Sequence, residues 1–245
     1  MEQEPVEGKI SEGKTKIVYR SSEIDRVLLK FKDDLTALDG KKHALLPRKG
    51  AINAGISAKI FQLLNDSGIP THYIRLCGSH LMEVRRLKMI PIEVVCRNIA
   101  AGHLVENLPI FKRGERLKEP IVEFYLKNDA LHDPMLVDDH IVALGLANRR
   151  EIARMKALTR RVNKILKKFM VERGLVLVDF KLEFGRDVEG ALRVGDELNL
   201  DSMRLWDLET GASVDKDVYR QGAPLDSVEE TYLKGYRYIV GEELK

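Results

Sequence analysis

The strongest chemical signal in the chain is a strand-like segment, Gly174 to Gly185, that carries three ionisable side chains on one face. It opens with four apolar residues, Leu175 to Val178, which suit a buried strand. It then alternates, so that Asp179, Lys181 and Glu183 share one face and three apolar residues share the other. Three charges beside an apolar face indicate either a functional site or a solvated face in which Lys181 balances the carboxylates.

A second strand, Ala191 to Leu198, is expected to pair with this segment through a two-residue turn at Glu189-Gly190. In that register Glu183 lies opposite Asp196, and like charges directly opposite each other destabilise a sheet. A divalent cation between them would reverse the sign of the interaction. Two carboxylates, phosphate oxygens and water are a typical arrangement around Mg²⁺, so the pair is a candidate metal site. A solvated hairpin face is the alternative.

Composition limits the classes of protein that fit the chain of 245 residues. Its 41 Lys and Arg against 38 Asp and Glu give a net charge of +3, too even to indicate nucleic acid as the main partner. No apolar run approaches the roughly 20 residues of a membrane span, so no membrane partner is expected. The acidic N-terminus lacks the apolar core of a signal peptide. Two cysteines are too few for a disulfide scaffold, which favours a reduced, cytoplasmic setting.

A glycine-containing turn between two strands is predicted near the N-terminus, within residues 6–19. Gly8 to Thr15 matches the GxxxxGK[ST] pattern, but the chain continues as a strand and not as the helix that a Walker loop requires. Glycines let a backbone approach phosphates, and Lys14 and Lys16 could neutralise them. An exposed basic hairpin is the alternative interpretation.

Arg97 ends an alternating strand, Ile92 to Arg97, and is followed by the small residues Ala100-Ala101-Gly102. An arginine in this position could bind an anion such as a phosphate monoester, or could form an ion pair with a nearby Glu. Both interpretations remain open on the sequence. Arg204 is a second candidate anion contact, whereas Trp206 is interpreted as a packing residue.

Helices are predicted at 51–66 and 148–173, and a final helix is predicted to open with a capping box at Ser227–Glu230. Asp138 and Asp139 should start a short helix. Strands are expected at 27–32, 71–76 and 81–86. The helix over 148–173 delivers the chain into the strand that bears Asp179 and Glu183.

Several motifs occur in an order that resembles the SAICAR synthetase (phosphoribosylaminoimidazole-succinocarboxamide synthase) family. Each motif is weak by itself, but the ordered set is specific and extends from about Gly8 to about Tyr236. The motifs are Glu12-Gly-Lys-Thr-Lys16, Asp39-Gly40, Arg97-Asn98 with Ala-Ala-Gly102, Leu126 to Pro134, Val178 to Gly185, Gly195-Asp-Glu197, Arg204-Leu-Trp-Asp207 and Asp215-Lys-Asp217.

The resemblance implies a two-lobed α+β fold with an ATP cleft between the lobes. A β-rich N-terminal lobe, kinase-like or ATP-grasp-like, would cover residues 1–86, and a mixed α/β lobe would cover residues 87–245. The implied reaction joins the carboxylate of carboxyaminoimidazole ribonucleotide to the amine of L-aspartate, with ATP and Mg²⁺, in purine biosynthesis. Relatives also suggest a homodimer.

The resemblance assigns roles to individual residues. Gly13, Lys14 and Lys16 resemble the loop that covers the phosphates, Lys127 and Glu183 resemble nucleotide contacts, and Glu183 and Asp196 match the magnesium ligands. Lys181 would neutralise phosphoryl oxygens, and Asp179 would share the same site. Arg97, Arg204, Lys216 and Arg220 resemble substrate contacts, while Asp39 and Asp133 match positions near the imidazole and the site of amide formation. Adenine would lie against Glu83 to Met89.

One departure from the family pattern concerns His103, since the family usually has Ser after Ala-Ala-Gly. A serine would bond the substrate phosphate, and His103 could donate from a ring nitrogen or point away.

Two other functions would use parts of the same residue pattern. A small-molecule kinase would use the same ATP and Mg²⁺ groups with a hydroxyl acceptor. A nucleotide-responsive or RNA-binding module would bind nucleic acid in a salt-dependent manner without turnover, which the near-neutral charge disfavours.

Overall fold

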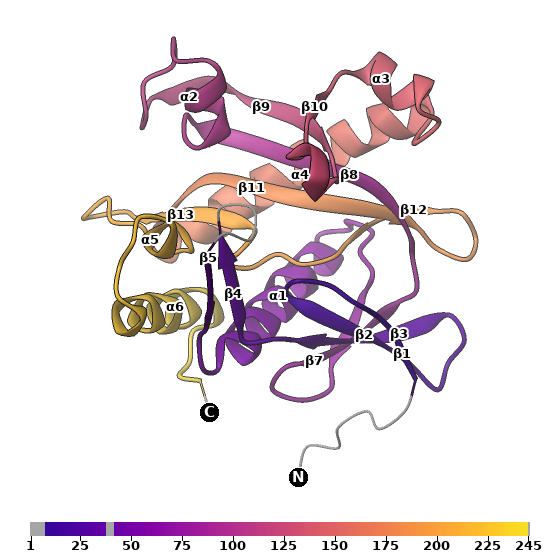
Figure 1. The fold of residues 1–245 in the computed structure, drawn as a ribbon, viewed down its shortest axis with the longest axis horizontal. Coiled ribbons are helices and arrows are strands. Elements are labelled where there is room, and N and C mark those ends of the chain that lie inside the picture. The colour runs from indigo at the N-terminus through magenta and orange to yellow at the C-terminus, as the bar shows by residue number, and fades with distance from the viewer. Residues whose placement is uncertain (1–7, 38–41, 245) are drawn as a thin grey trace.

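The computed structural model describes residues 8–37 and 42–244, which form two large antiparallel sheets, a two-stranded sheet and the helices packed on them (Figure 1). In this described part, the smaller sheet has the strand order β1-β2-β3-β7-β6. Its strands are β1 (Lys9–Glu12), β2 (Lys16–Arg20), β3 (Arg26–Phe31), β7 (Leu81–Arg85) and β6 (Tyr73–Leu76). A separate hairpin joins β4 (Asp34–Ala37) to β5 (Lys42–Leu45).

The larger sheet has the order β10-β9-β8-β11-β12 among the described residues, with β13 also paired to β11. The strands are β10 (Met135–Leu136), β9 (Arg116–Leu126), β8 (Lys88–Ile99), β11 (Leu175–Arg186), β12 (Leu192–Gly195) and β13 (Met203–Asp207). β8 borders β11 on one side, while β13 and β12 share the other side. β11 is therefore flanked along both edges, and its opening residues Leu175, Leu177 and Val178 are buried, which suits their apolar side chains.

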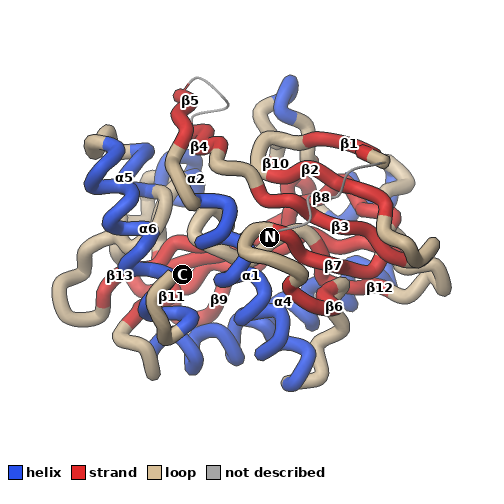
Figure 2. Tube along the Cα trace, turned by 90° about the horizontal axis from the view of Figure 1, so that it is seen from below, coloured by secondary structure: helices blue, strands red, loops and turns tan. Residues whose placement is uncertain are grey.

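Two long helices cover the sheets. α1 (Lys49–Asp66) packs on β3, β6 and β7 of the smaller sheet and against α6 (Leu225–Val240). A Cβ at Gly55 would lie 2.8 Å from the ring of Tyr236, so glycine permits the close approach of α1 to α6. α4 (Arg149–Val171) covers one face of the larger sheet at β8, β9 and β11. Figure 2 shows α5 and α6 at the end of the molecule opposite β1, β2 and β3.

α4 is fixed to the sheet by its cap and by a buried pair of amides. Asn148 accepts a hydrogen bond from the backbone of Glu151 at 2.9 Å, and the Glu151 side chain bonds back to the backbone of Asn148, which makes a capping box. Asn163 of α4 and Asn98 of β8 exchange two side-chain hydrogen bonds of 2.8 Å. Buried amides that satisfy each other in this way fix the helix over one face of the sheet.

The remaining helical segments are short: α2 (His103–Asn107), the 3₁₀ turn η1 (Asp129–Leu131), α3 (Asp138–Ala143) and α5 (Asp217–Arg220). α2 and η1 follow β8 and β9, and α5 follows β13. These short elements lie in the segments that the sequence analysis associates with substrate and nucleotide.

The two sheets are joined by backbone and by a buried ion pair. Val194 of β12 bonds His72 and Pro70, which precede β6, at 2.9 Å each. Lys49 of α1 lies 2.6 Å from Asp201, and both side chains are almost fully buried. Tyr232 of α6 donates to the other oxygen of Asp201 at 2.6 Å. Removing either partner would leave an uncompensated buried charge, so this contact ties α1 and α6 to the larger sheet.

The α+β class and most elements agree with the sequence analysis. The helices predicted at 51–66 and 148–173 correspond to α1 and α4, and the predicted short helix is α3. The strand predicted at 92–97 is longer, because β8 extends from Lys88 to Ile99. The final helix begins at Leu225 with Pro224 at its N-cap, so the predicted capping box at Ser227 is wrong: the chain is already helical there.

The predicted hairpin register after β11 is also wrong by one residue. Asp187 accepts hydrogen bonds from the backbone of Glu189 and Ala191, which makes a three-residue loop in place of the two-residue turn. Glu183 therefore pairs with Gly195 and not with Asp196. Asp196 lies beyond the end of β12, with a positive φ of 61°.

One large apolar core joins residues from both sheets and from α1, α4 and α6, and Trp206 packs on a small cluster of Ile99, Ala101 and Val178. Trp206 is therefore a packing residue, as the sequence indicated. Within residues 8–37 and 42–244, every helix is too short or too polar to cross a bilayer.

Candidate active site

The register of the larger sheet places three charged residues in one row across β8, β11 and β13. Asp179 of β11 pairs with Arg97 of β8 on one side and with Arg204 of β13 on the other. Asp179 Oδ2 accepts a hydrogen bond from Arg97 Nη1 at 3.0 Å and from Arg204 Nη1 at 2.8 Å. Asp179 is buried, so the two guanidinium groups balance a carboxylate that is largely shielded from water.

Arg97 is buried and held by several partners. Its Nε donates to Glu123 at 2.6 Å, and its Nη2 donates to the hydroxyl of Tyr125 at 3.3 Å. The ion-pair interpretation of Arg97 is thus confirmed, with Glu123 of β9 as the partner. The same contacts fix the plane of the guanidinium and leave one hydrogen of Nη2 to donate to an anion.

Arg204 is more open than Arg97 and has unused donors. Its Nε donates to Asp217 at 2.9 Å and its Nη1 donates to Asp179. A Cβ at Gly102 would lie 2.7 Å from Arg204 Nη2, and Gly102 has a positive φ of 54°. Only glycine fits this position without strain, because the backbone there approaches the guanidinium face directly.

His103, which replaces the expected serine, is the first residue of α2 and lines the same pocket as Arg97 and Arg204. Its side chain is 64% exposed, and its Nε2 lies 3.8 Å from the carboxylate of Glu106. The imidazole therefore lies at the open side of the pocket, where it can reach a bound anion without rearrangement of the sheet.

A second charged cluster lies two to four residues further along β11. Lys181 lies 2.5 Å from Glu93 of β8 and 3.5 Å from Glu183. Lys127, which follows β9, contacts both oxygens of Glu183 at 2.6 and 2.7 Å. Glu183 has only 3% of its side chain exposed, so its charge depends on these two lysines in the protein alone.

The N-terminal hairpin brings a further lysine to this cluster. Lys16 of β2 lies 3.0 Å from Asp196 and 2.7 Å from Glu197. Although Asp196 is not opposite Glu183 in the ladder, its carboxylate still raises the pKa of Glu183. The two predicted carboxylates thus lie near enough to interact, although the predicted register is wrong.

The turn between β1 and β2 contains Gly13, whose backbone N–H bonds the carbonyl of Lys16 at 2.8 Å. Lys14 lies 2.7 Å from Asp129 of η1. The segment is a β-hairpin, as predicted, and not a strand–helix phosphate loop. Two of its lysines contact residues of the larger sheet and its loops, so the hairpin lies beside the charged cluster.

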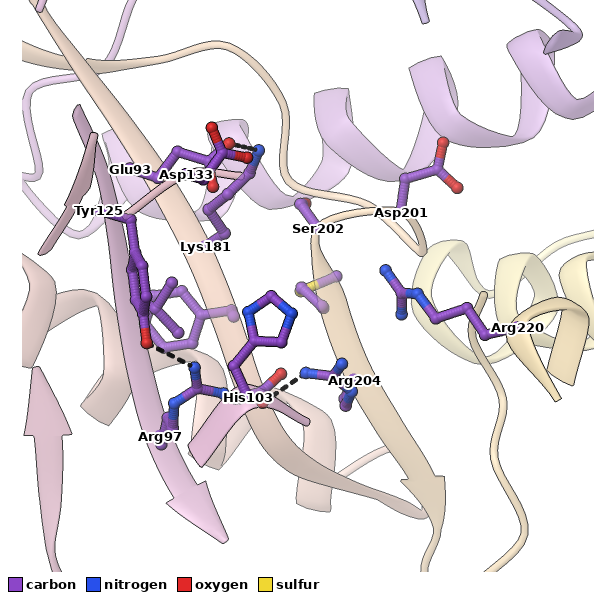
Figure 3. Close-up of a pocket in the computed structure, with 14 residues that line it drawn as sticks. Glu93, Arg97, His103, Tyr125, Asp133, Lys181, Asp201, Ser202, Arg204 and Arg220 are labelled. Carbon is purple, nitrogen blue, oxygen red and sulfur yellow. Dashed lines mark hydrogen bonds and ion pairs between the residues drawn. The ribbon is translucent and has the colours of Figure 1, made fainter. Parts of the chain in front are cut away.

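A pocket of about 210 Å³ connects the two clusters (Figure 3). Lys181, Glu93 and Asp133 lie at one side of it, and Arg97, Tyr125, His103 and Arg204 lie at another. Asp133 has a positive φ of 45°, and its Oδ1 accepts a hydrogen bond from the backbone N–H of Asn128 at 2.7 Å. The predicted site residue Asp39 lies outside the described residues.

α5 supports the third side of the pocket. Asp217 receives hydrogen bonds from Arg204 and, at 2.5 Å, from Arg220, which lines the pocket. Asp215 has no exposed surface and accepts two backbone hydrogen bonds of 2.7 Å, from Leu205 and Asp217. Asp215 thus fastens the start of α5 to β13 and positions the carboxylate that holds Arg204.

Lys216 lies between these two aspartates in sequence and is buried. Burial lowers the pKa of Lys216, and the positive charges of Arg220 and Lys49 act in the same direction, against the pull of Asp201. Lys216 is not among the residues that line the pocket, so of the two predicted contacts near α5 only Arg220 faces it.

The two candidate metal ligands differ in how their charge is stabilised. Burial raises the pKa of Glu183, and the carboxylate of Asp196 adds to that rise against the two nearby lysines. Burial by itself would also raise the pKa of Asp196. The charges of Lys16, Lys127 and Lys181 outweigh burial and hold that pKa below its usual range. Burial lowers the pKa of Lys181, but the carboxylates around it, Glu183 first, raise it overall.

This donor set fits a magnesium ion that is shared with a phosphate. Among the described residues no group of three or more His, Cys, Asp and Glu side chains could enclose a metal alone. Mg²⁺ in nucleotide sites is commonly held by one or two carboxylates with phosphate and water oxygens. Two mutually repelling carboxylates, Glu183 and Asp196, among lysines meet that requirement.

Several residues of the site were not singled out in the sequence. Glu93 shares a strand face with Arg97, and that alternation was the available signal. Glu123 and Tyr125 of β9 gave no comparable signal, because their role depends on the pairing of β9 with β8. Asp201 and Ser202 also line the pocket, and only the tertiary structure brings them there.

Comparisons with known proteins identify relatives of the whole chain. The family model described as SAICAR synthetase matches residues 9–237. Phosphoribosylaminoimidazole-succinocarboxamide synthase of Methanoculleus marisnigri is 50% identical over 220 residues, which are 90% of each chain. The enzyme of that name from Pyrococcus furiosus is 47% identical over 235 residues, or 96% of this chain and 98% of the relative.

Solved structures agree with the sequence relatives. A SAICAR synthetase (Type-2) in complex with ADP superposes with a TM-score of 0.90 at 43% identity, covering 96% of this chain and 99% of the other. Phosphoribosylaminoimidazole-succinocarboxamide synthase from Ehrlichia chaffeensis superposes with a TM-score of 0.90 at 39% identity, covering 95% and 98%.

The burial of Asp215 predicts a specific pH dependence of stability. Burial, followed by the negative charge of Asp217, raises the pKa of Asp215 to about 7, whereas an unfolded Asp has a pKa of about 3.9. The folded state therefore holds a proton that the unfolded chain has released, and the associated stability is lost as the pH rises through about 7. The loss is on the order of 4 kcal/mol between pH 4 and 8.

Asp215→Asn should remove this pH-dependent contribution to stability. Between pH 5 and pH 8 the free energy of unfolding should therefore fall more in the wild type than in the variant. Urea unfolding at each pH measures it, with Asp25→Asn, at a partly exposed aspartate, as control. A difference that does not change with pH would contradict the assignment.

Proposed function

The chain belongs to the SAICAR synthetase family, and from this premise we propose how its residues perform the reaction of that family. It is an ATP-dependent carbon–nitrogen ligase of purine biosynthesis that forms SAICAR. We propose that the carboxylate of carboxyaminoimidazole ribonucleotide is coupled to the amine of L-aspartate, with release of ADP and phosphate.

The observation that carries the proposal is the separation of two charged clusters along one face of β11. Asp179, with its two arginines, lies four residues from Glu183, which corresponds to about 13 Å of extended strand. A ribonucleotide with a phosphate at one end and a carboxylate at the other suits such a face. The phosphate would lie at the arginines and the carboxylate near Lys181.

Arg204 is the principal proposed phosphate contact, because it retains unused donors beside the backbone of Gly102. Arg97 contributes charge and its remaining donor, and His103 closes the open side of the same subsite. Asp179 acts by positioning: one of its oxygens holds both guanidinium groups at a fixed spacing. An arginine that is already oriented loses little side-chain entropy when it binds a phosphate.

The nucleotide phosphates would occupy the other cluster. Gly13, Lys14 and Lys16 cover them from the hairpin, and Lys127 moves from Glu183 to a phosphate oxygen. Glu183 and Asp196 would hold Mg²⁺, which when bound supplies positive charge to the phosphate oxygens. Lys181, between Glu93 and Glu183, is suited to neutralise charge on the transferred phosphoryl group.

The chemistry explains why these groups must lie together. A carboxylate is a poor acyl donor, since oxide would have to leave. Transfer of the γ-phosphoryl group to the carboxylate oxygen gives an acyl phosphate and ADP. The aspartate amine then attacks the acyl carbon, phosphate leaves with the C–O electron pair, and the amine loses a proton. The pocket contributes by holding the reacting groups close and excluding water.

Asp133 and Asp39 are proposed to act near the imidazole and the new amide, where a carboxylate can accept the proton from the attacking amine. Asp133 lines the pocket beside Lys181, which supports this role. Lys216 and Arg220 are proposed contacts to substrate carboxylates, since Arg220 lines the pocket and Lys216 lies at the N-cap of the helix that carries Arg220.

We further propose two lobes, residues 1–86 and 87–245, with ATP between them and adenine against the backbone of Glu83 to Met89. The division is supported by the sheets, because β7 ends at Arg85 and β8 begins at Lys88. We also propose a cytoplasmic homodimer. Exposed apolar residues between 131 and 144 support self-association: Leu131, Met135, Val137, Val142 and Leu144.

ADP release tests the reaction. The purified protein is incubated with carboxyaminoimidazole ribonucleotide, ATP and Mg²⁺, with and without L-aspartate, and the product is identified by mass spectrometry. We expect ADP release and a new amide only with both co-substrates. Release that continues without aspartate, with a hydroxyl compound as acceptor, would support the kinase alternative instead.

Glu183→Gln removes one charge from the proposed metal site. We expect turnover at saturating ATP and Mg²⁺ to fall by about 10²- to 10³-fold, because several kcal/mol of charge stabilisation depend on the ion. Glu189→Gln, in the exposed loop after the same strand, is the matched control. Unchanged Mg²⁺-dependent turnover in a folded Glu183→Gln protein would refute the metal assignment.

Arg204→Ala removes the proposed phosphate contact. The KM for the ribonucleotide should rise about 10- to 100-fold, since hydrogen bonds to charged groups contribute roughly 1.5–3 kcal/mol, while the KM for ATP should change little. Arg193→Ala serves as the control, because it removes an arginine of β12 that is paired with Asp187. Equal increases in both KM values would argue against a phosphate contact.

A further inference from the structure

The exposed face of α4 concentrates positive charge on a chain that is otherwise slightly acidic. α4 contains nine Lys and Arg residues and a single Glu in 23 residues. Of the 41 basic and 38 acidic residues in the chain, 32 basic and 37 acidic residues remain outside α4. The net charge of +3 therefore averages over two regions of opposite sign, and it is a poor guide to the partners of this helix.

The basic side chains of α4 form one continuous surface. Eight of them are exposed. Arg149 is paired with Asp139, and the other seven are Arg150, Arg154, Arg160, Arg161, Lys164, Lys167 and Lys168. At about 100° per residue these positions fall within about 140° of arc, opposite the buried stripe of the helix. The surface, which we call the α4 basic face, extends for about 27 Å along the helix axis.

Most charges of this face have no counter-charge in the part of the chain that the structure describes. Arg149, at the first position of the helix, and Lys156, which is half-buried, bind Asp139 and Asp138 at 2.7 Å each. Within the α4 basic face, Lys168 has a carboxylate, Glu172, at 3.9 Å. Across residues 8–37 and 42–244, the other six members of the face form no ion pair within 4.0 Å. Like charges three and four residues apart repel, and a bound polyanion would relieve that repulsion.

The composition of the face argues for a particular partner. Its exposed apolar residues are limited to Ala153, Ala157 and Val171, and it has no aromatic side chain, so it lacks the anchors of a protein interface. A second copy that presented the same face would be repelled. Single-stranded nucleic acid is usually bound with aromatic stacking, which is absent from this face.

The remaining kind of partner for the α4 basic face is one that carries a regular array of negative charge. A nucleic-acid duplex carries one phosphate charge per about 1.7 Å of its axis, and lysines and arginines that release its counterions bind it without reading sequence. We infer that the α4 basic face binds the phosphate backbone of a nucleic-acid duplex, independently of sequence.

This surface is separate from the proposed active site. α4 packs on the larger sheet, where Asn163 bonds Asn98 of β8. The neighbouring β8 residues Arg97 and Glu93 point to the other face, into the pocket. Substitutions on the α4 basic face should therefore leave SAICAR formation unchanged, and the inference does not depend on the proposed catalytic roles.

Two charge-matched variants test the inference. Arg161→Glu, Lys164→Glu and Lys168→Glu together reverse the α4 basic face, whereas Lys59→Glu, Arg113→Glu and Lys118→Glu make the same net change at exposed positions elsewhere. Fluorescence anisotropy measures binding to a labelled 20-base-pair RNA duplex at several salt concentrations. Wild-type affinity should fall by about 10³-fold between 50 and 200 mM salt if about six phosphates are contacted.

We expect the α4 variant to bind the duplex at least about 100-fold more weakly at 50 mM salt and the control variant less than about 3-fold more weakly. A variant with Gln at the same three α4 positions should lose an intermediate amount of affinity for the duplex. It tests the inference even if the charge-reversed variant does not fold. Equal losses in the α4 and control variants, or no wild-type binding at 50 mM salt, would overturn the inference. So would binding to phosphatidylserine vesicles without binding to the duplex.

Discussion

The site depends on the requirement that every ionisable side chain on the buried face of β11 receives an opposite charge from another element. Asp179, Lys181 and Glu183 follow each other on one face, and two of the three are buried. Each is compensated from a different direction: Asp179 by arginines of β8 and β13, Lys181 by Glu93, and Glu183 by Lys127. An unpaired charge there would cost several kcal/mol, so the surrounding elements are constrained in position as well as in composition.

This constraint links the fold to the proposed chemistry. In the protein alone, lysines satisfy carboxylates that are proposed to hold Mg²⁺, and carboxylates orient arginines that are proposed to hold a phosphate. Substrate and nucleotide can then replace some of these partners, and the side chains that they contact are already charged and oriented. Pre-organised charges of this kind stabilise a developing transition state without a large reorganisation.

The two faces of the larger sheet differ in how far their charges are balanced. One face carries the pocket, in which opposite charges are closely matched. The other is covered by α4, whose outer surface is basic and mostly unmatched. A near-neutral chain can therefore contain both a balanced active site and a strongly charged helix surface, because net charge carries no information on position.

The sequence by itself determined the features that depend on local periodicity. The alternation in β11, the stripes of α1 and α4, and the β-hairpin that excludes a Walker loop follow from neighbouring residues, and all agree with the structure. The ordered motifs were sufficient for the family, which the comparisons bear out. The residue roles within the site stay predictions, and Asp39 lies outside the described residues.

Only the tertiary structure decided which charges meet. Hydrogen bonds to Asp187 close a three-residue loop, so the pairing register differs by one residue from the predicted one. Asp196 therefore lies outside the strand pairing and contacts Lys16 of the other sheet. The partners of Arg97 and Arg204, Glu123 and Asp217, come from segments whose approach depends on strand pairing and on the loop after β13. Periodicity fixes the face on which a side chain lies, but the partner on that face depends on register and on contacts between distant segments.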